Sequence, residues 1–121
     1  MSTLKYNTWL NTDNTENYKC RAWVNFNGTG TVAIRGSGNV SSITDNGAGT
    51  YQVNFINAMS DANYCPAIFS SNNGSIRSWA QQDGTNTSVY GRYLTTSLSF
   101  FIGDSSSTLY DVQFVNVAIF R

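Results

Sequence analysis

The chain has 121 residues, enough for one domain with one hydrophobic core. Seven basic and seven acidic residues cancel, and only 12% of residues are charged, so the chain lacks the positive field that nucleic acid or an anionic membrane surface requires. The absence of histidine excludes Ser-His and Cys-His nucleophile pairs and histidine-based metal sites. No run of about 18 apolar residues occurs, so no transmembrane helix is expected.

The first 19 residues are polar and carry few side chains suited to a core. The main exceptions are Leu4, Tyr6, Trp9 and Leu10. From residue 20 onward, short runs of alternating apolar residues are separated by Gly, Asn and Asp, a pattern typical of strands joined by tight turns. We therefore expect an N-terminal arm or attachment segment over 1–19 and a β-sandwich domain over 20–121.

The domain is expected to contain eight or nine short strands at a spacing of about ten residues. Turns are indicated at 27–30, 45–49 and 83–86, which are rich in Asn, Asp and Gly. Pro66 lies near the start of a run, which predicts an edge strand. No helical period occurs, so the predicted fold class is all-β, an antiparallel, jelly-roll-like β-sandwich. The expected strands lie within 21–26, 32–34, 40–44, 51–55, 65–69, 76–82, 87–94, 98–102 and 109–120.

The last expected strand is apolar on both faces from Phe114 onward. Such a pattern predicts burial on both sides, although a two-layer sandwich normally buries one face of each sheet. Either the strand is central in a thicker fold, or its second face meets a neighbouring subunit. The second interpretation is favoured because so small a domain has little room for a third layer. It assigns Val115, Val117 and Ile119 to an oligomer interface.

Few residues suit catalysis or metal binding. Glu16 is the only glutamate, and most aspartates fall in turns, where Asp bonds to the local backbone. Asp111 and a turn aspartate would form a glycosidase pair only across a groove, and no motif indicates one. Cys20 and Cys65 form one disulfide or stay free, with buried free thiols favoured. We expect no enzymatic activity, no cofactor and no metal site.

An expected hairpin over 76–94 places two aromatic rings, two guanidinium groups and an amide on one face. Such a set suits stacking on a sugar and hydrogen bonding to it. The favoured alternative is packing within the protein or against a partner subunit, because Trp, Tyr and Arg are enriched at interfaces. The five side chains are Arg77, Trp79, Gln81, Tyr90 and Arg92.

The segment 18–35 reads YKCRAWVNFNGTGTVAIR. It resembles a module of virion proteins from marine and cyanobacterial tailed phages, which are often tail-fibre or other structural proteins. Many such fibres carry a long shaft before the module, whereas only 1–19 precede it here. The same resemblance extends over 1–5, 39–47, 51–55, 59–64 and 115–121.

The resemblance implies a homotrimeric virion structural protein, assembled in the cytoplasm of a bacterial host, that acts as a tail-fibre or receptor-binding tip. Its arm would attach to other virion proteins through Leu4, Tyr6, Trp9 and Leu10, and a host surface glycan would be the partner of the exposed hairpin face. The alternative is a capsid decoration, cement or head-fibre protein that stabilises the virion.

Overall fold

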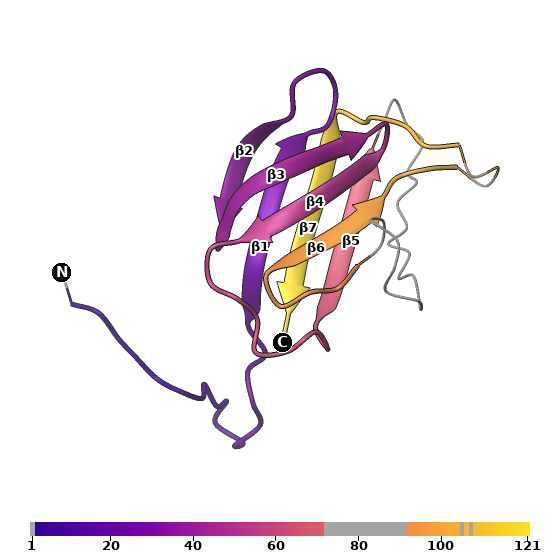
Figure 1. The fold of residues 1–121 in the computed structure, drawn as a ribbon. Coiled ribbons are helices and arrows are strands. Elements are labelled where there is room, and N and C mark those ends of the chain that lie inside the picture. Colours follow the sequence, from indigo (N-terminus) through magenta and orange to yellow (C-terminus); the bar gives the residue numbers. More distant parts are fainter. Residues whose placement is uncertain (1, 72–91, 105, 107) are drawn as a thin grey trace.

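The computed structural model describes residues 2–71, 92–104, 106 and 108–121. Within these residues the chain forms seven strands and no helix, so none of this part has a helix suited to crossing a membrane. Two antiparallel sheets, one of four and one of three strands, pack together (Figure 1). The strands are β1 (Cys20–Asn27), β2 (Ala33–Gly38), β3 (Val40–Gly47), β4 (Thr50–Phe55), β5 (Cys65–Ser71), β6 (Ser97–Phe101) and β7 (Phe114–Phe120).

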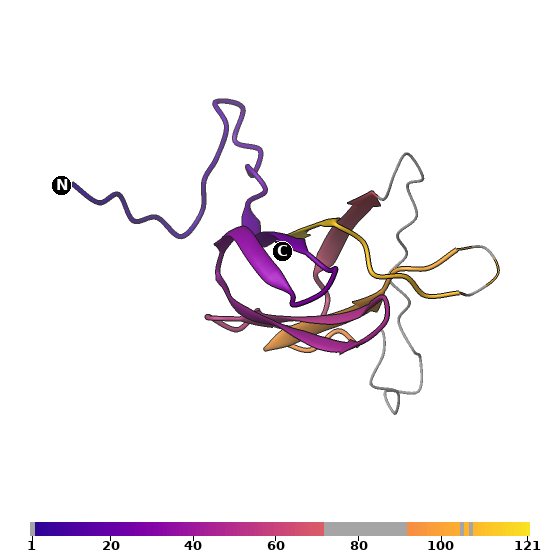
Figure 2. The same ribbon diagram turned by 90° about the horizontal axis from the view of Figure 1, so that it is seen from above.

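The four-stranded sheet has the order β2-β1-β7-β5, and the three-stranded sheet has the order β3-β4-β6. Figure 2 shows the two sheets as facing layers. The chain changes sheet between β2 and β3, between β4 and β5, between β5 and β6, and between β6 and β7. As a result the first and last strands lie side by side in the middle of one sheet, where Val24 is opposite Val117.

The core lies between the two sheets and is built from alternate side chains of the strands. The period of two follows from the pleat of a strand, which points successive side chains to opposite faces. Aromatic rings meet edge to face within this layer, with Phe26 and Tyr51 centroids 5.2 Å apart. The largest fully buried side chains are Tyr51, Phe26, Phe100, Leu98, Ile102, Ile119, Val24, Val53 and Val115.

The structure corrects the interface prediction for the last strand. Val115, Val117 and Ile119 are only 0%, 3% and 0% exposed, because the three-stranded sheet of the same chain covers them. The outward side chains of β7 are instead the exposed Phe114 and Phe120, with Asn116 and Ala118 between them. Any partner of β7 therefore meets the opposite face from the one predicted.

Other expectations are confirmed within the described residues. The fold is all-β and two-layered, and the six strands expected between 21 and 69 and near 98–102 are present as β1 to β6. Pro66 lies in β5, which is an edge of the four-stranded sheet, as its missing N–H group requires. The strand expected over 76–82 and most of the one over 87–94 lie outside the described residues.

Residues 2–19 form no strand and lead away from the sandwich (Figures 1 and 2). A local turn shapes this arm: the Asn11 amide donates to the Thr15 carbonyl oxygen at 2.8 Å, and Asn14 has φ 65°. Beyond the turn, the Lys19 ammonium lies 4.9 Å from the centre of the Tyr6 ring. The arm thus has local structure of its own, although its side chains remain largely outside the core.

Candidate functional site

The outer surface of the four-stranded sheet is unusually aromatic. We call this surface the aromatic face. Its large exposed side chains are Trp23, Phe69, Phe114 and Phe120, which are 47%, 62%, 43% and 39% exposed. They come from β1, β5 and β7, so segments far apart in the sequence meet here because their strands pair.

Strand register sets the shape of the aromatic face. Ala67, Ala118, Trp23 and Gly38 lie opposite one another across the four strands. The Trp23 indole extends over β2, where a Cβ atom added to Gly36 would lie 3.3 Å from the ring and one added to Gly38 would clash with it. The glycines of β2 therefore give the indole its place on the sheet, and the two alanines leave the middle of the face low.

Polar groups on the aromatic face are bonded within the chain. The Asn25 side-chain amide donates to the Asn116 side-chain oxygen on the neighbouring strand. Arg35 donates to the Gln113 carbonyl oxygen at 2.8 Å, and its guanidinium carbon lies 4.5 Å from the centre of the Phe114 ring. This cation–π contact and the hydrogen bond hold the guanidinium beside Phe114.

Both cysteines lie at one end of the aromatic face. Cys20 on β1 and Cys65 on β5 are each paired with Phe120 of β7, which lies between them. Both thiols are free, as expected, but both cysteines are exposed, so the prediction that they are buried is wrong. Two strand spacings separate their Cα atoms by about 10 Å, beyond the roughly 7 Å limit for a disulfide within one chain.

The outer surface of the three-stranded sheet has the opposite chemistry. We call it the amide face. The Asn54 side-chain amide donates to Ser42 Oγ and Thr44 Oγ1, each at 3.0 Å. Gln52 Nε2 donates to Asn54 Oδ1 at 2.7 Å, and Ser99 Oγ donates to Gln52 Oε1 at 3.3 Å. At the middle of β3 and β4, the described outward side chains are therefore uncharged groups bonded to one another.

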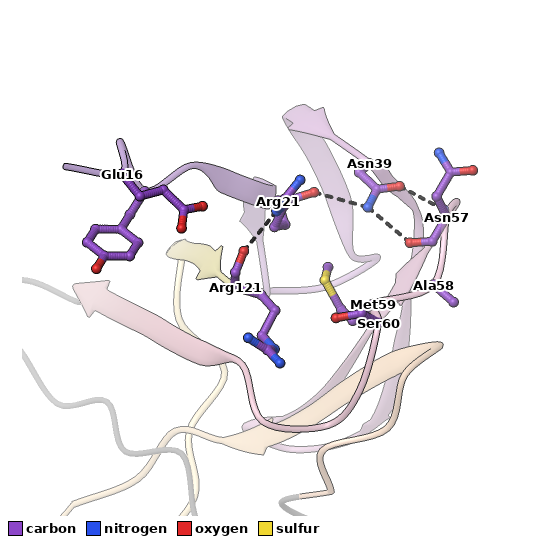
Figure 3. Close-up of a pocket in the computed structure, with 9 residues that line it drawn as sticks. Glu16, Arg21, Asn39, Asn57, Ala58, Met59, Ser60 and Arg121 are labelled. Atoms are coloured by element: carbon purple, nitrogen blue, oxygen red, sulfur yellow. Dashed lines mark hydrogen bonds between the residues drawn. The ribbon is translucent and has the colours of Figure 1, made fainter. Parts of the chain in front are cut away.

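A cavity of about 730 Å³ opens at the end of the sandwich beside the arm (Figure 3). Asn39 shapes one wall: its side-chain amide donates to the carbonyl oxygens of Arg21 and Asn57, and its Oδ1 accepts from the Asn57 amide at 2.7 Å. Arg21 Nε donates to the Arg121 carbonyl oxygen at 2.9 Å. The lining residues are Glu16, Tyr18, Arg21, Asn39, Asn57, Ala58, Met59, Ser60 and Arg121.

The charges near this cavity are largely structural. Arg121 makes a two-point salt bridge to Asp61, with Nε 2.9 Å from Oδ1 and Nη2 2.5 Å from Oδ2. These hydrogen bonds from Arg121 lower the pKa of Asp61 to about 2. A carboxylate with so low a pKa stays ionised at neutral pH and serves poorly as a general acid or base.

A second polar group sits at the opposite side of the core. The Tyr51 hydroxyl lies 2.8 Å from Asp111 Oδ1 and 3.0 Å from the Gly28 carbonyl oxygen. Asp111 Oδ1 also accepts from the Gly49 amide at 2.8 Å. Burial, followed by the hydrogen bond to Asp111, raises the pKa of Tyr51 well above its usual range. Asp111 therefore ties a loop to the core through a tyrosine hydroxyl and a backbone amide.

The residues predicted as sites fall into three groups. Arg77, Trp79, Gln81 and Tyr90 lie outside the described residues. Arg92 is half-buried, and its backbone carbonyl accepts a hydrogen bond from the Ser99 amide at 2.9 Å. The predicted attachment residues of the arm are all exposed: Leu4, Tyr6, Trp9 and Leu10.

Sequence reasoning missed the aromatic face. The signal was present in β1, where Trp23 and Asn25 alternate with the core residues Val24 and Phe26 and so must point outward. It was weaker in β5, where the apolar series at 65, 67 and 69 points outward and Ile68 packs against the core.

No cluster suited to metal binding appears in the part of the chain that the structure describes. Among residues 2–71, 92–104, 106 and 108–121, no three Cys, Asp or Glu side chains gather where they could hold a metal ion. The aromatic face is thus the most distinctive surface available to a partner.

Comparison of the chain with protein-family models, with curated proteins and with solved structures finds no match. No family is shown. What the protein does must therefore be argued from its own surfaces.

Proposed function

We propose that this chain is a phage virion structural protein, a homotrimeric tail-fibre or receptor-binding tip module that works through its surfaces and catalyses no reaction. The observation that carries the proposal is the pairing of a self-contained β-sandwich with two exposed apolar surfaces. One is the aromatic face, and the other is formed by the apolar side chains of the arm. Exposed apolar patches of this kind mark sites of protein association.

The arm supports the attachment part of the proposal. Leu4 is 83% exposed, and the Tyr6 and Trp9 rings contact each other edge to face with centroids 5.6 Å apart. These side chains lie on the arm, away from the core between the two described sheets, and remain exposed. In the proposed role they dock into another virion protein, as the aromatic anchors of protein interfaces do.

The finer fold assignment belongs to the same proposal. We propose a jelly-roll-like sandwich of eight or nine strands, of which seven lie within the described residues. The repeated change of sheet and the neighbouring positions of β1 and β7 support it, because such connections are typical of double-sheet Greek-key folds.

The host-contacting surface rests on the sequence pattern. In the proposal, Arg77, Trp79, Gln81, Tyr90 and Arg92 contact a host surface glycan. Each site binds weakly, and the three copies of a trimer supply avidity. Glycan-array binding by the purified chain, lost in Trp79→Ala, is the expected result for this part.

A capsid decoration, cement or head-fibre protein is the second candidate, and the arm is the observation that favours it. An exposed segment with apolar side chains is suited to clamping neighbouring capsid subunits as well as to anchoring a fibre. The two candidates differ in place and number on the particle.

Immunogold labelling and quantitative mass spectrometry of purified phage particles test both candidates. We expect the chain at the tail, in a small multiple of three copies per particle. Labelling spread over the capsid in hundreds of copies would replace the fibre role by the decoration role. Absence of the chain from intact particles would refute the virion assignment, and conversion of a host polysaccharide by the purified chain would refute the claim that it is no enzyme.

A further inference from the structure

We infer that the aromatic face is the surface through which three copies of this chain meet in a closed ring. The inference rests on the proposed trimer and adds where its subunits touch. It replaces the interface predicted at Val115, Val117 and Ile119, which the second sheet of the same chain occupies.

The aromatic patch is too small to hold a pair of chains together on its own. Side chains that are 39–62% exposed, with about 150–250 Å² of surface for each aromatic residue, leave a patch of roughly 300–500 Å². Two patches meeting face to face bury roughly 600–1,000 Å², less than the roughly 1,200 Å² at the lower end of stable interfaces. In the proposed ring of three, each copy contacts two neighbours through different parts of this face, and the three contacts form together, so each small contact is stabilised by the other two.

The chemistry of the patch favours a copy of the same chain as its partner. Two arginines at the rim of the aromatic face are already bonded within the chain: Arg35 contacts Phe114 and donates to the Gln113 carbonyl oxygen, and Arg21 donates to the Arg121 carbonyl oxygen. The amides of Asn25 and Asn116 are bonded to each other. Covering these groups leaves few broken hydrogen bonds, so a weakly charged surface like that of the chain itself is a suitable partner.

The shape of the patch indicates how a neighbour fits. Phe69 projects from β5, an edge of the four-stranded sheet, and it is the most exposed of the four aromatic side chains. Ala67 and Ala118 leave a low strip beside Trp23. We place the Phe69 edge of one copy over the low strip of the next, which makes the contact head-to-tail and lets the ring close.

Sedimentation equilibrium of the full chain between 1 and 100 µM tests this inference. The wild type is expected to form a species of three chains. Phe69→Glu is expected to raise the concentration of half-assembly at least tenfold, because it puts a charge into the contact, and Phe120→Ser to raise it by a smaller factor. Far-UV circular dichroism checks that both variants keep their strands.

Two control variants separate this inference from its alternatives. Ile56 is 64% exposed, similar to Phe69, but lies after β4 and outside the aromatic face, so Ile56→Glu should leave assembly within twofold of wild type. Trp9→Ser should also leave it unchanged. Equal loss of assembly in Trp9→Ser and Phe69→Glu would overturn the inference in favour of an arm that covers the face.

A wild type that stays monomeric at 100 µM, or folded Phe69→Glu and Phe120→Ser variants that still form trimers, would also overturn the inference. The proposed function is judged separately, by the presence of the chain on intact particles.

Discussion

At the scale of single residues, hydrogen bonds from buried tyrosine hydroxyls join loops to the core. The Tyr51 hydroxyl and the Asp111 carboxylate join the turn before β4 to the loop before β7. Tyr64 does the same on the other side of the core, with its hydroxyl 3.0 Å from the Leu94 carbonyl oxygen and 3.1 Å from that of Ser97. Each phenol has a hydrogen-bond partner, as a buried hydroxyl requires.

These two tyrosines predict a loss of stability at alkaline pH. Burial raises the pKa of Tyr51 and of Tyr64 above the value of about 10 for an unfolded tyrosine. A raised pKa means that the folded chain binds the phenolic proton more tightly than the unfolded chain does. The stabilisation is therefore complete below about pH 10 and falls as the pH rises further.

Urea unfolding between pH 8 and pH 11.5 measures this effect. The double variant Tyr51→Phe, Tyr64→Phe is expected to reduce the fall above pH 10, whereas Tyr18→Phe, at an exposed position, keeps the wild-type slope. At neutral pH, Tyr51→Phe alone should lower the free energy of unfolding by about 1–3 kcal/mol, since buried acceptors lose their donor. Equal slopes in the wild type and the double variant would contradict the prediction.

At the scale of strands, the alternation of apolar residues predicted which side chains share a face better than it predicted which face is buried. In β1 and β4 the core-forming apolar residues occupy every second position, and polar or aromatic residues stand between them. The buried side chains, such as Val24 and Val53, could therefore be predicted from the sequence. In β7 both parities are apolar. A period of two then shows which residues share a face but not which face turns inward. The interface prediction placed Val115, Val117 and Ile119 on the outer face, whereas they lie on the inner one.

The candidate site was harder to predict because it depends on pairing between distant strands. Trp23, Phe69 and Phe114 lie on three strands that no local pattern brings together. The glycines beside the Trp23 indole are placed by the register between β1 and β2, which includes a bulge between Asn25 and Phe26. Pairing over such separations is set by tertiary structure, and alternation within each strand does not encode it.

A charge on the inner side of β7 tests the corrected direction. Val117→Lys buries an ammonium group without a partner in the core, so we expect the chain to unfold and not merely to dissociate, with a loss of about 3–5 kcal/mol or more. Circular dichroism and urea unfolding measure it. The matched variant Ala118→Lys, on the outer side of the same strand, should stay folded. A folded Val117→Lys variant would show that the core assignment is wrong.

At the scale of the whole molecule, the two exposed thiols report on contacts between copies. Because Cys20 and Cys65 stand on either side of Phe120, they are too far apart to bond within one chain. Mild oxidation should therefore give only disulfides between chains, seen as reducible dimers and larger species on non-reducing gels. Cys20→Ser and Cys65→Ser each limit the product to dimers. A single-chain disulfide in the wild type, detected by peptide mapping, would contradict the described register.

The amide face of the three-stranded sheet has a consequence for any particle that carries this protein. When the opposite sheet turns toward its neighbours, the described outward side chains at the middle of β3 and β4 show hydroxyl and carboxamide groups to the surrounding medium. Dissolved salt screens attraction between charges but hardly alters neutral dipoles at short range. Adhesion through the amide face should then persist from low to high salt concentration.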